Sequence, residues 1–228
     1  MVKKVYGIGV GIGGESLTLK ALKVLNKVDK IFIPISKEGK SSVAYKLIKE
    51  FIKDNKDVEY LLFPMIKDKE KLKKYWEDAL NKILKEDGEI AIITIGDPTL
   101  YSTFSYLWKL LKDNNIEIEI VNGISSIFAA ASLLNISLAE GEEKLCILPQ
   151  GKDLKKYVDE FDTIIVMKTK SLGEILKEIN RDDITIYLAK RIGFKDQLIA
   201  CGKIKDIDFE LFNDYLSLAI IKKDKDDS

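Results

Sequence analysis

The sequence contains no histidine, and this absence is its most restrictive feature. Without imidazole, neither a Ser-His-Asp nor a Cys-His nucleophile system can form, and the usual histidine-containing metal sites are excluded. The only two cysteines, Cys146 and Cys201, lie far apart and form no Cys-x-x-Cys pair, so they match neither a disulfide framework nor a zinc site. We therefore expect free thiols in a reducing cytoplasm, no resident metal, and chemistry that needs no histidine.

An excess of charge and long apolar runs are also missing. The chain has 37 lysines and arginines against 37 aspartates and glutamates, so it lacks the strong positive charge typical of duplex-binding proteins. No run approaches the roughly 18 apolar residues of a membrane-spanning helix. The first apolar run is too short and too rich in glycine for a signal peptide. We expect a soluble cytoplasmic protein that binds neither nucleic acid nor a membrane.

The first half of the chain alternates short apolar runs with amphipathic helical repeats. The runs predict strands at 5–10, 30–35, 58–63, 90–95 and 116–121. The repeats predict helices at 17–28, 43–52, 72–84, 100–112 and 126–134. Continuous apolar strands are typical of sheets covered on both faces. Residues 1–136 are therefore predicted to form an open, mostly parallel α/β domain.

A polar, acidic segment at 137–144 predicts a domain boundary, so that residues 137–228 form a second α/β domain. Its apolar runs predict strands at 145–148, 163–168, 184–189, 197–201 and 216–221, and its helical repeat predicts a helix at 172–179. Several connections are too short for a crossover helix, which predicts a mixed sheet. The charged end, 222–228, is expected to be frayed.

A glycine-rich turn, Gly9-Val10-Gly11-Ile12-Gly13-Gly14, follows the first predicted strand. It satisfies the G-x-G-x-x-G pattern, in which backbone amides approach an anion at a helix N-terminus. A nicotinamide site also needs a carboxylate after the second strand, but that strand ends with Ser36 and Lys37, and Asp29 precedes it. A plain strand-to-helix turn is an alternative interpretation.

A second turn, Gly96-Asp97-Pro98-Thr99-Leu100-Tyr101-Ser102-Thr103, follows the fourth predicted strand. Asp97 as N-cap and Pro98 as first helical residue would explain part of it. They do not explain a cluster of hydroxyl groups at the carboxyl end of a central strand, where open α/β sheets bind ligands. In a third turn, Asn122 to Ser126, the serines are predicted either to cap a helix or to contact a ligand.

Together the three turns resemble those of the tetrapyrrole methylase family, two-domain S-adenosylmethionine enzymes of cobalamin and sirohaem biosynthesis. The resemblance extends to about Lys222. Its motifs are Gly9 to Gly13 leading to Leu17-Thr18-Leu19-Lys20-Ala21, then Gly96-Asp97-Pro98, and then Gly123-Ile124-Ser125-Ser126. The run from Gly96 to Leu107 is most similar to family members that methylate C20 of precorrin-2 or cobalt-factor II. Ile12 and Gly14-Glu15 depart from the usual first loop, with Glu15 as a substitute for its aspartate.

The resemblance implies that S-adenosylmethionine binds in a cleft between the domains. It implies cofactor contacts from Val10, Gly96, Asp97, Leu100, Ser125, Ser126, Met167 and Gly193. The tetrapyrrole carboxylates would meet basic residues, and the implied substrate contacts are Gly11, Gly13, Lys37 and Arg191, with Lys40 and Lys190 nearby. Tyr101 is the candidate catalytic residue. The resemblance further implies a homodimer, and lysines gathered at a polyanionic substrate would make a basic cleft that acids elsewhere balance.

Three alternatives stay open from the sequence. One is another methyltransferase of this family, acting on a different ring position, on a protein side chain as in diphthine synthesis, or on ribosomal RNA. The second is a non-catalytic nucleotide-binding protein that retains the glycine-rich turn. The third is a nicotinamide-dependent dehydrogenase, against which the missing carboxylate counts.

Overall fold

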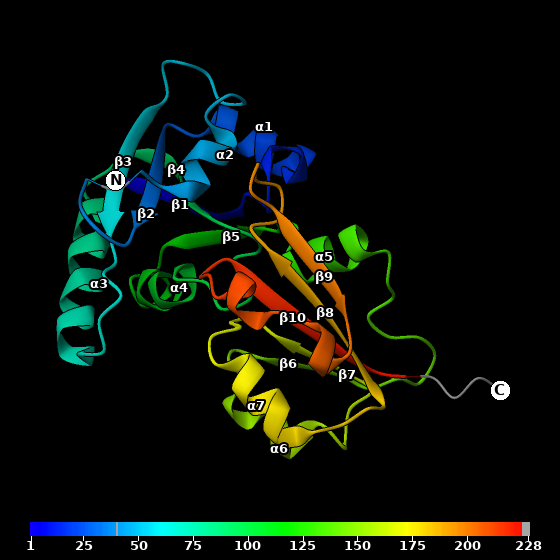
Figure 1. Cartoon of the computed structure of the whole chain (residues 1–228). Coiled ribbons are helices and arrows are strands. Elements are labelled where there is room, and N and C mark those ends of the chain that lie inside the picture. The colour runs from blue at the N-terminus through cyan, green and yellow to red at the C-terminus, as the bar shows by residue number, and fades with distance from the viewer. Residues whose placement is uncertain (40, 225–228) are drawn as a thin grey trace. The chain divides into compact units, whose positions relative to one another are not determined.

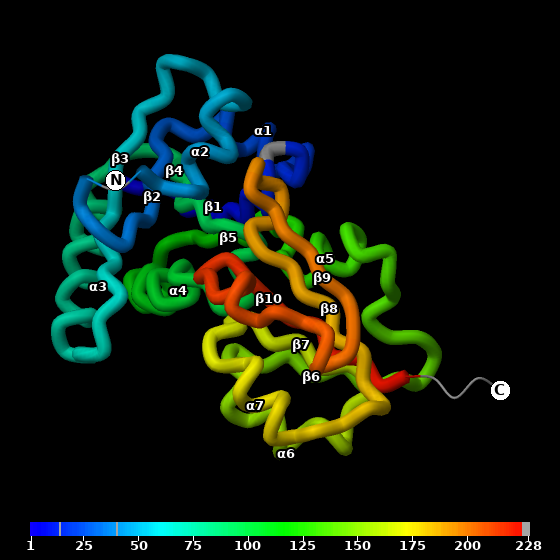
Figure 2. Tube along the Cα trace, in the orientation of Figure 1, coloured from blue at the N-terminus to red at the C-terminus, as the bar shows by residue number. Residues whose placement is uncertain are grey.

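The computed structural model describes residues 1–39 and 41–224, and Figures 1 and 2 show the course of the chain. Lys40 and the last four residues of the charged end lie outside the described residues. Contacts within the chain divide it into two compact units, Met1–Ser125 and Ser126–Ser228. This division assigns the helix at 126–134 to the second unit, whereas the predicted boundary after residue 136 assigns it to the first.

The first unit contains a five-stranded sheet in which every pair of neighbours is parallel. Its strands are β1 (Val2–Gly9), β2 (Lys30–Ile35), β3 (Asp57–Leu62), β4 (Gly88–Thr94) and β5 (Glu117–Val121), in the order β3-β2-β4-β1-β5. Its helices are η1 (Gly14–Ser16), α1 (Leu19–Lys27), α2 (Val43–Ile48), α3 (Lys69–Leu84) and α4 (Phe104–Asp113). The run from Ile90 to Ile93 in β4 is fully buried, as the apolar pattern predicted for a sheet covered on both faces.

Three helices of this unit, α1, α2 and α3, follow a residue whose side chain accepts a hydrogen bond from the first helical turn. The Ala21 N–H donates to Thr18 Oγ1 at 3.1 Å, and the Tyr45 N–H donates to Ser42 Oγ at 3.4 Å. These caps satisfy backbone groups that the first helical turn leaves without a partner. Helix α2 ends at Ile48, four residues earlier than its apolar repeat predicted.

The prediction that a helix begins at about Leu100 is wrong, and so is the alternative interpretation in which Asp97 is an N-cap and Pro98 the first helical residue. Helix α4 begins at Phe104. Tyr101 has a left-handed backbone, with φ of 47°, and this conformation cannot continue a right-handed helix. The Phe104 N–H donates instead to Ser102 Oγ at 3.1 Å, so Ser102 supplies the side chain at the helix start.

The second unit contains a mixed sheet, which confirms the predicted class. Its strands are β6 (Leu145–Leu148), β7 (Thr163–Val166), β8 (Ile184–Lys190), β9 (Leu198–Gly202) and β10 (Ser217–Lys223), in the order β6-β7-β10-β8-β9. β6 and β7 are parallel, and the other neighbours are antiparallel. Its helices are α5 (Ser126–Leu134), η2 (Gly151–Asp153), α6 (Leu154–Tyr157), α7 (Leu172–Ile179), η3 (Ile204–Asp206) and η4 (Phe209–Phe212). The sequence did not predict the short α6, which buries Leu154 against α7.

Within residues 1–39 and 41–224, no helix has the length and apolar character needed to cross a membrane.

Candidate functional site

Three turns meet at the carboxyl edge of the sheet in the first unit. We call them the first turn (residues 10–18, after β1), the second turn (95–103, after β4) and the third turn (122–125, after β5). Because β4, β1 and β5 are parallel neighbours, their carboxyl ends lie at one edge. In the strand order, the connection from β1 to β2 runs toward the β3 end of the sheet, whereas the connection from β4 to β5 runs toward the opposite end (Figure 1). Open α/β sheets bind ligands at such a reversal.

Glycines allow the three turns to touch through their backbones. A Cβ atom on Gly123 would lie 2.2 Å from the carbonyl oxygen of Gly96, and a Cβ on Gly9 would lie 2.5 Å from the same oxygen. Gly96 itself has φ of 69°, a conformation that favours glycine. Each of these three positions therefore requires glycine for packing, whether or not a ligand binds there.

Backbone hydrogen bonds join the first turn to the second. Gly11 and Gly96 exchange two of them, with N···O distances of 3.2 and 2.9 Å, and the Val10 N–H donates to the Thr94 carbonyl at 2.9 Å. Val10, Gly11 and Gly13 are all buried. The structure thus places these predicted residues in the turn cluster, where Gly11 and the Val10 amide hold the turn together, while their contacts with cofactor or substrate stay predictions.

The Asp97 carboxylate joins the second turn to the third. Oδ1 accepts the Thr99 N–H at 2.8 Å and also the Thr99 hydroxyl, while Oδ2 accepts the Gly123 N–H at 3.1 Å and the Asn122 Nδ2 amide at 3.2 Å. Burial acts to raise the pKa of this carboxyl, but the hydrogen bonds outweigh burial and the pKa is lowered. Asp97 is therefore ionised at neutral pH.

Thr18 adds a link between the first and third turns. Its hydroxyl donates to the Asn122 carbonyl at 3.4 Å and also caps helix α1. The capping makes α1 begin at Leu19, several residues beyond the glycine-rich pattern. A dinucleotide fingerprint instead runs directly into its helix, and its sheet has the order 3-2-1-4-5-6, not the order found here. The nicotinamide interpretation therefore loses its structural basis.

The remaining candidates of the second and third turns differ in exposure. Tyr101 is 58 % exposed in its left-handed conformation, and Leu100 is half-buried. Ser125 is buried at the end of the third turn, and Ser126 begins α5 in the second unit. The sequence interpretation did not select Ile124, whose side chain is 41 % exposed. The sequence feature that could have indicated Ile124 is its apolar character inside a turn that otherwise consists of glycine and polar residues.

In the second unit, Met167, Arg191 and Gly193 lie at one edge of the mixed sheet. Strands β7 and β8 end at this edge, and β10, which pairs with both, begins there. The Arg191 N–H donates to the Leu216 carbonyl at 2.8 Å, and the Gly193 N–H donates to Gln197 Oε1 at 2.8 Å. The structure thus brings together the three predicted residues of this unit.

Arg191 is engaged by carboxylates of its own unit. Its Nε lies 2.6 Å from Asp196 Oδ2, and its Nη1 lies 4.0 Å from Asp214 Oδ2. The ion pair with Asp196 raises the pKa of Arg191, and the same contact lowers the pKa of Asp196. A substrate carboxylate that bound Arg191 would therefore have to displace Asp196 or Asp214. Lys37 is exposed in the segment after β2, and Lys190 donates to the Leu211 carbonyl.

A pair of buried hydroxyl groups supports this edge, and the sequence interpretation missed it. Thr169 Oγ1 lies 2.6 Å from the Phe212 carbonyl oxygen and 2.5 Å from Ser217 Oγ, which itself lies 2.6 Å from the Asp214 carbonyl. The contacts tie the segment after β7 to the segment before β10. The residues are 48 positions apart, so no local pattern signals the contact.

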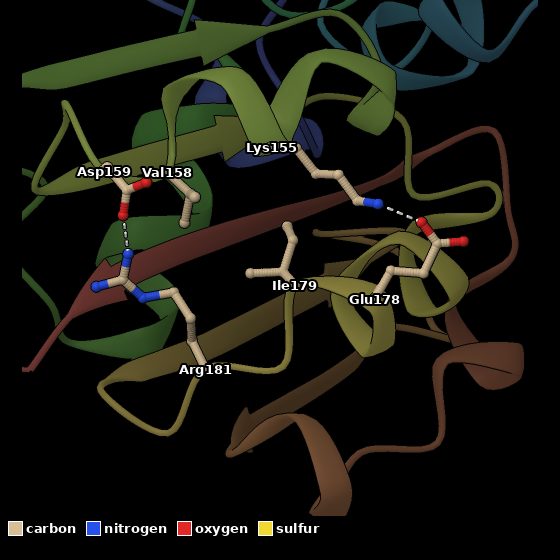
Figure 3. A pocket seen from close by; sticks show the side chains of 6 residues that line it. All are labelled: Lys155, Val158, Asp159, Glu178, Ile179 and Arg181. Carbon is tan, nitrogen blue, oxygen red and sulfur yellow. Dashed lines mark hydrogen bonds and ion pairs between the residues drawn. The ribbon is translucent and has the colours of Figure 1, made fainter.

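A hollow of about 400 Å³ lies elsewhere in the second unit, between α6, α7 and the segment after α7 (Figure 3). Its lining residues are Lys155, Val158, Asp159, Glu178, Ile179 and Arg181. The four charged residues form two ion pairs, Lys155 with Glu178 and Arg181 with Asp159. The hollow contains none of the predicted site residues.

Comparison with known proteins identifies the class to which this fold and turn cluster belong. The model of the tetrapyrrole (corrin/porphyrin) methylases matches residues 4–208. The chain is therefore a member of the tetrapyrrole methylase family.

Two relatives show which members of the family this chain is similar to. A Methanocaldococcus jannaschii protein named probable cobalt-precorrin-2 C(20)-methyltransferase is 69 % identical over 227 residues, which cover 99 % of this chain and 98 % of that protein. The cobalt-precorrin-2 C(20)-methyltransferase of Salmonella typhimurium is 25 % identical over 173 residues, 72 % of each chain.

Solved structures agree with the fold. The cobalt precorrin-4 methyltransferase CbiF matches with a TM-score of 0.73 at 22 % identity, covering 96 % of this chain and 94 % of that one. The Thermus thermophilus uroporphyrin-III C-methyltransferase, solved with S-adenosyl homocysteine, matches with a TM-score of 0.70 at 16 % identity, covering 96 % and 97 %. These matches confirm the predicted pair of α/β sheets.

Proposed function

We propose that this protein transfers a methyl group from S-adenosylmethionine to C20 of cobalt-precorrin-2 in cobalamin biosynthesis. One observation carries the proposal: the 69 % identity to the Methanocaldococcus jannaschii protein extends over nearly the full length of both chains. The similarity of the segment from Gly96 to Leu107 to C20-methylating enzymes supports the same ring position. The name of that relative favours the cobalt-containing substrate over metal-free precorrin-2.

The turn cluster of the first unit fits a cofactor that carries a sulfonium group. Asp97 places an ionised carboxylate at the sheet edge, and a nearby negative charge favours a cation. Leu100 and Ile124 supply apolar surface next to the glycine backbones. Supported by the family resemblance, Val10, Gly96, Ser125 and Ser126 would hold the cofactor, together with Met167 and Gly193 of the second unit.

S-adenosylmethionine supplies a methyl group on a positively charged sulfur, and the sulfur leaves as a neutral thioether. The side chains therefore need not generate a strong nucleophile, which is consistent with a chain that lacks histidine. Their contribution is to hold the reacting atoms in line, an effect that supplies roughly 7–11 kcal/mol when the geometry is correct. Rigid turns built on backbone contacts are suited to this task.

Tyr101 is the proposed residue at the macrocycle. Its exposed side chain and left-handed backbone support the proposal, since sparsely populated conformations cluster at ligand sites. It would orient the macrocycle or assist loss of the C20 proton. Lys37 and Arg191 are the proposed partners of the carboxylates, and Gly11 and Gly13 the proposed backbone contacts.

We further propose a cytoplasmic homodimer. Free Cys146 and Cys201 support a reducing compartment, and the family resemblance supports the dimer. Sedimentation equilibrium tests the association: a mass of twice 25.8 kDa is expected, and a mass of 25.8 kDa at all concentrations would contradict the dimer.

The function is tested with S-adenosylmethionine that carries ¹³C in its methyl group. The purified chain is incubated anaerobically with cobalt-precorrin-2, and separately with precorrin-2 or cobalt-precorrin-4. We expect one labelled methyl group at C20 of cobalt-precorrin-2, located by NMR, and none in cobalt-precorrin-4. Absence of label from both precorrin-2 forms, or label at another ring carbon, would refute the proposal.

A further inference from the structure

We propose that Met65 and Ile66, in the segment that follows β3, form an apolar contact for the ring of the tetrapyrrole substrate and contribute to its selection. The inference rests on the proposed function and deepens it, because it adds a substrate contact outside the three turns.

Both side chains are exposed although both are apolar. Met65 is 68 % exposed, and its neighbour Ile66 is 37 % exposed. Single exposed apolar residues are common on protein surfaces, so exposure alone assigns them no function. Their fixed position and their place in the sheet distinguish this pair.

The chain is anchored on both sides of the pair. Before it, Phe63 is buried in the core that includes α3, and its N–H donates to the Ile35 carbonyl at 2.7 Å. After it, the Asp68 side chain accepts a hydrogen bond from the first turn of α3. Within the segment, the Ile66 N–H donates to the Pro64 carbonyl at 3.0 Å. The pair is therefore presented by a segment that is held at both ends.

Strand β3 places the pair at the ligand edge of the first sheet. β3 is parallel to β2, and its last residue, Leu62, lies opposite Ile35, the last residue of β2. Residues 63–68 therefore leave the sheet at the same edge as the three turns. Because β2 lies between β3 and β4, the ends of these two strands are about 10 Å apart, two strand spacings. A tetrapyrrole ring at the second turn can reach the segment, since four linked pyrrole rings span a comparable distance.

The chemistry of this segment suits such a ring. The ring has a hydrocarbon framework with π-electron faces, and its carboxylates project from the rim. The flexible, polarizable thioether of methionine packs favourably against such faces. Ile66 adds a branched apolar surface, and the exposed Lys67 follows directly as a cation suited to a carboxylate. A ring bound here would cover both apolar side chains.

Kinetics of the double variant Met65→Ser/Ile66→Ser test the contact. We expect the KM for cobalt-precorrin-2 to rise about tenfold or more, because the variant loses apolar surface that the ring would cover. The kcat should change by less than about twofold, since the contact is the same in the ground state and the transition state. Calorimetry should show an unchanged Kd for S-adenosylhomocysteine. Met65→Leu keeps an apolar side chain and should retain the KM of the unmodified protein.

Phe51→Ser is the matched control. Phe51 is also apolar and is 42 % exposed, but it lies between α2 and β3 and thus at the amino edge of the sheet. Its substitution should leave the KM unchanged. An equal rise of the KM in Phe51→Ser would overturn the proposal, because the effect would then not depend on the ligand edge.

A second measurement reports the contact without catalysis. The chain has three methionines, Met1, Met65 and Met167, whose methyl groups can be labelled with ¹³C for NMR. The Met65 resonance is assigned by its absence from Met65→Leu. Anaerobic addition of cobalt-precorrin-2 should shift or broaden it, because the π-system and the metal of a bound ring alter the resonance of a methyl group in contact. S-adenosylhomocysteine alone should leave it unchanged.

Failure of this inference differs from failure of the proposed function. A double variant with the KM of the unmodified protein would overturn the apolar contact, and so would a Met65 resonance that stays unchanged when the substrate is bound. Both results are compatible with normal methylation by the unmodified protein. Unmodified protein that labels neither cobalt-precorrin-2 nor precorrin-2 would instead refute the methyltransferase function itself.

Discussion

The carboxyl edge of the first unit and the Met167–Gly193 edge of the second are held together in different ways. In the first unit, the backbones of Gly9, Gly96 and Gly123 are in direct contact. The Asp97 carboxylate also accepts a hydrogen bond from the Gly123 N–H. In the second unit, the buried hydroxyls of Thr169 and Ser217 and the ion pair of Arg191 with Asp214 connect segments that are far apart in the chain. Substitutions that add atoms should therefore destabilise the edge of the first unit, and substitutions that remove polar atoms should destabilise the edge of the second.

The largest effect is expected for Gly123→Ala. The added Cβ would meet the Gly96 carbonyl oxygen at 2.2 Å, and since the obstacle is backbone, no side chain can turn away to relieve the contact. We expect a loss of about 3 kcal/mol in the free energy of unfolding, measured by urea titration. Gly202→Ala is the control, because its Cβ would lie 3.7 Å from the nearest atom. Equal stability of the two variants would contradict the close packing of the turns.

A smaller loss is expected for Thr169→Val in the second unit. The substitution keeps the shape of the side chain but removes a hydroxyl that contacts Phe212 and Ser217. Leaving buried polar groups without a partner costs about 1–3 kcal/mol. Differential scanning calorimetry should therefore show a lower Tm.

Thr163→Val is the matched control for this variant. Thr163 is also fully buried, but its hydroxyl has no hydrogen-bond partner among the described residues. Removing it should leave stability unchanged or raise it by about 1 kcal/mol. If both threonine variants lost stability equally, the buried hydroxyl pair would not be what supports this edge.

The smallest effect concerns Glu119, in the middle of β5. Hydrogen bonds from Lys20 and Lys4 lower the pKa of Glu119 to about 2 from its ordinary 4.5. Because the folded state favours the ionised form, Glu119 stabilises the protein above about pH 4.5, and this contribution is lost as the pH falls toward 2.

Thermal melts of Glu119→Gln between pH 2 and pH 7 test this linkage. The Tm of the variant should fall less steeply below pH 4.5 than that of the unmodified protein, by a small amount because the side chain is partly exposed. The exposed Glu142→Gln serves as control. Parallel Tm curves for the unmodified protein and Glu119→Gln would show that the ion pairs of Lys4 and Lys20 do not contribute.

The sequence was sufficient to predict both sheets, because continuous apolar runs separated by helical repeats leave few other folds. The order of the strands could not be predicted from the sequence, because the insertion of β4 between β2 and β1 depends on pairing between distant segments. The start of α4 was mispredicted because Tyr101 takes a backbone conformation that its residue type rarely adopts.

The residues of the candidate site were easier to predict than their roles. The glycine turns were visible because their patterns follow predicted strands. The role of Asp97 was not, because its Oδ2 partners lie 25 and 26 positions further along the chain. Arg191 was selected as a basic residue in a loop, and only the folded chain shows that Asp196 and Asp214 already engage it.

The central claim is that the three turns of the first unit bind S-adenosylmethionine. A crystal structure of the full chain with S-adenosylhomocysteine tests it most directly. We predict ligand density in contact with the first, second and third turns, with Asp97 still bound to Gly123 and Asn122. Density elsewhere, for example in the hollow lined by Lys155 and Arg181, with the turns empty, would contradict the claim.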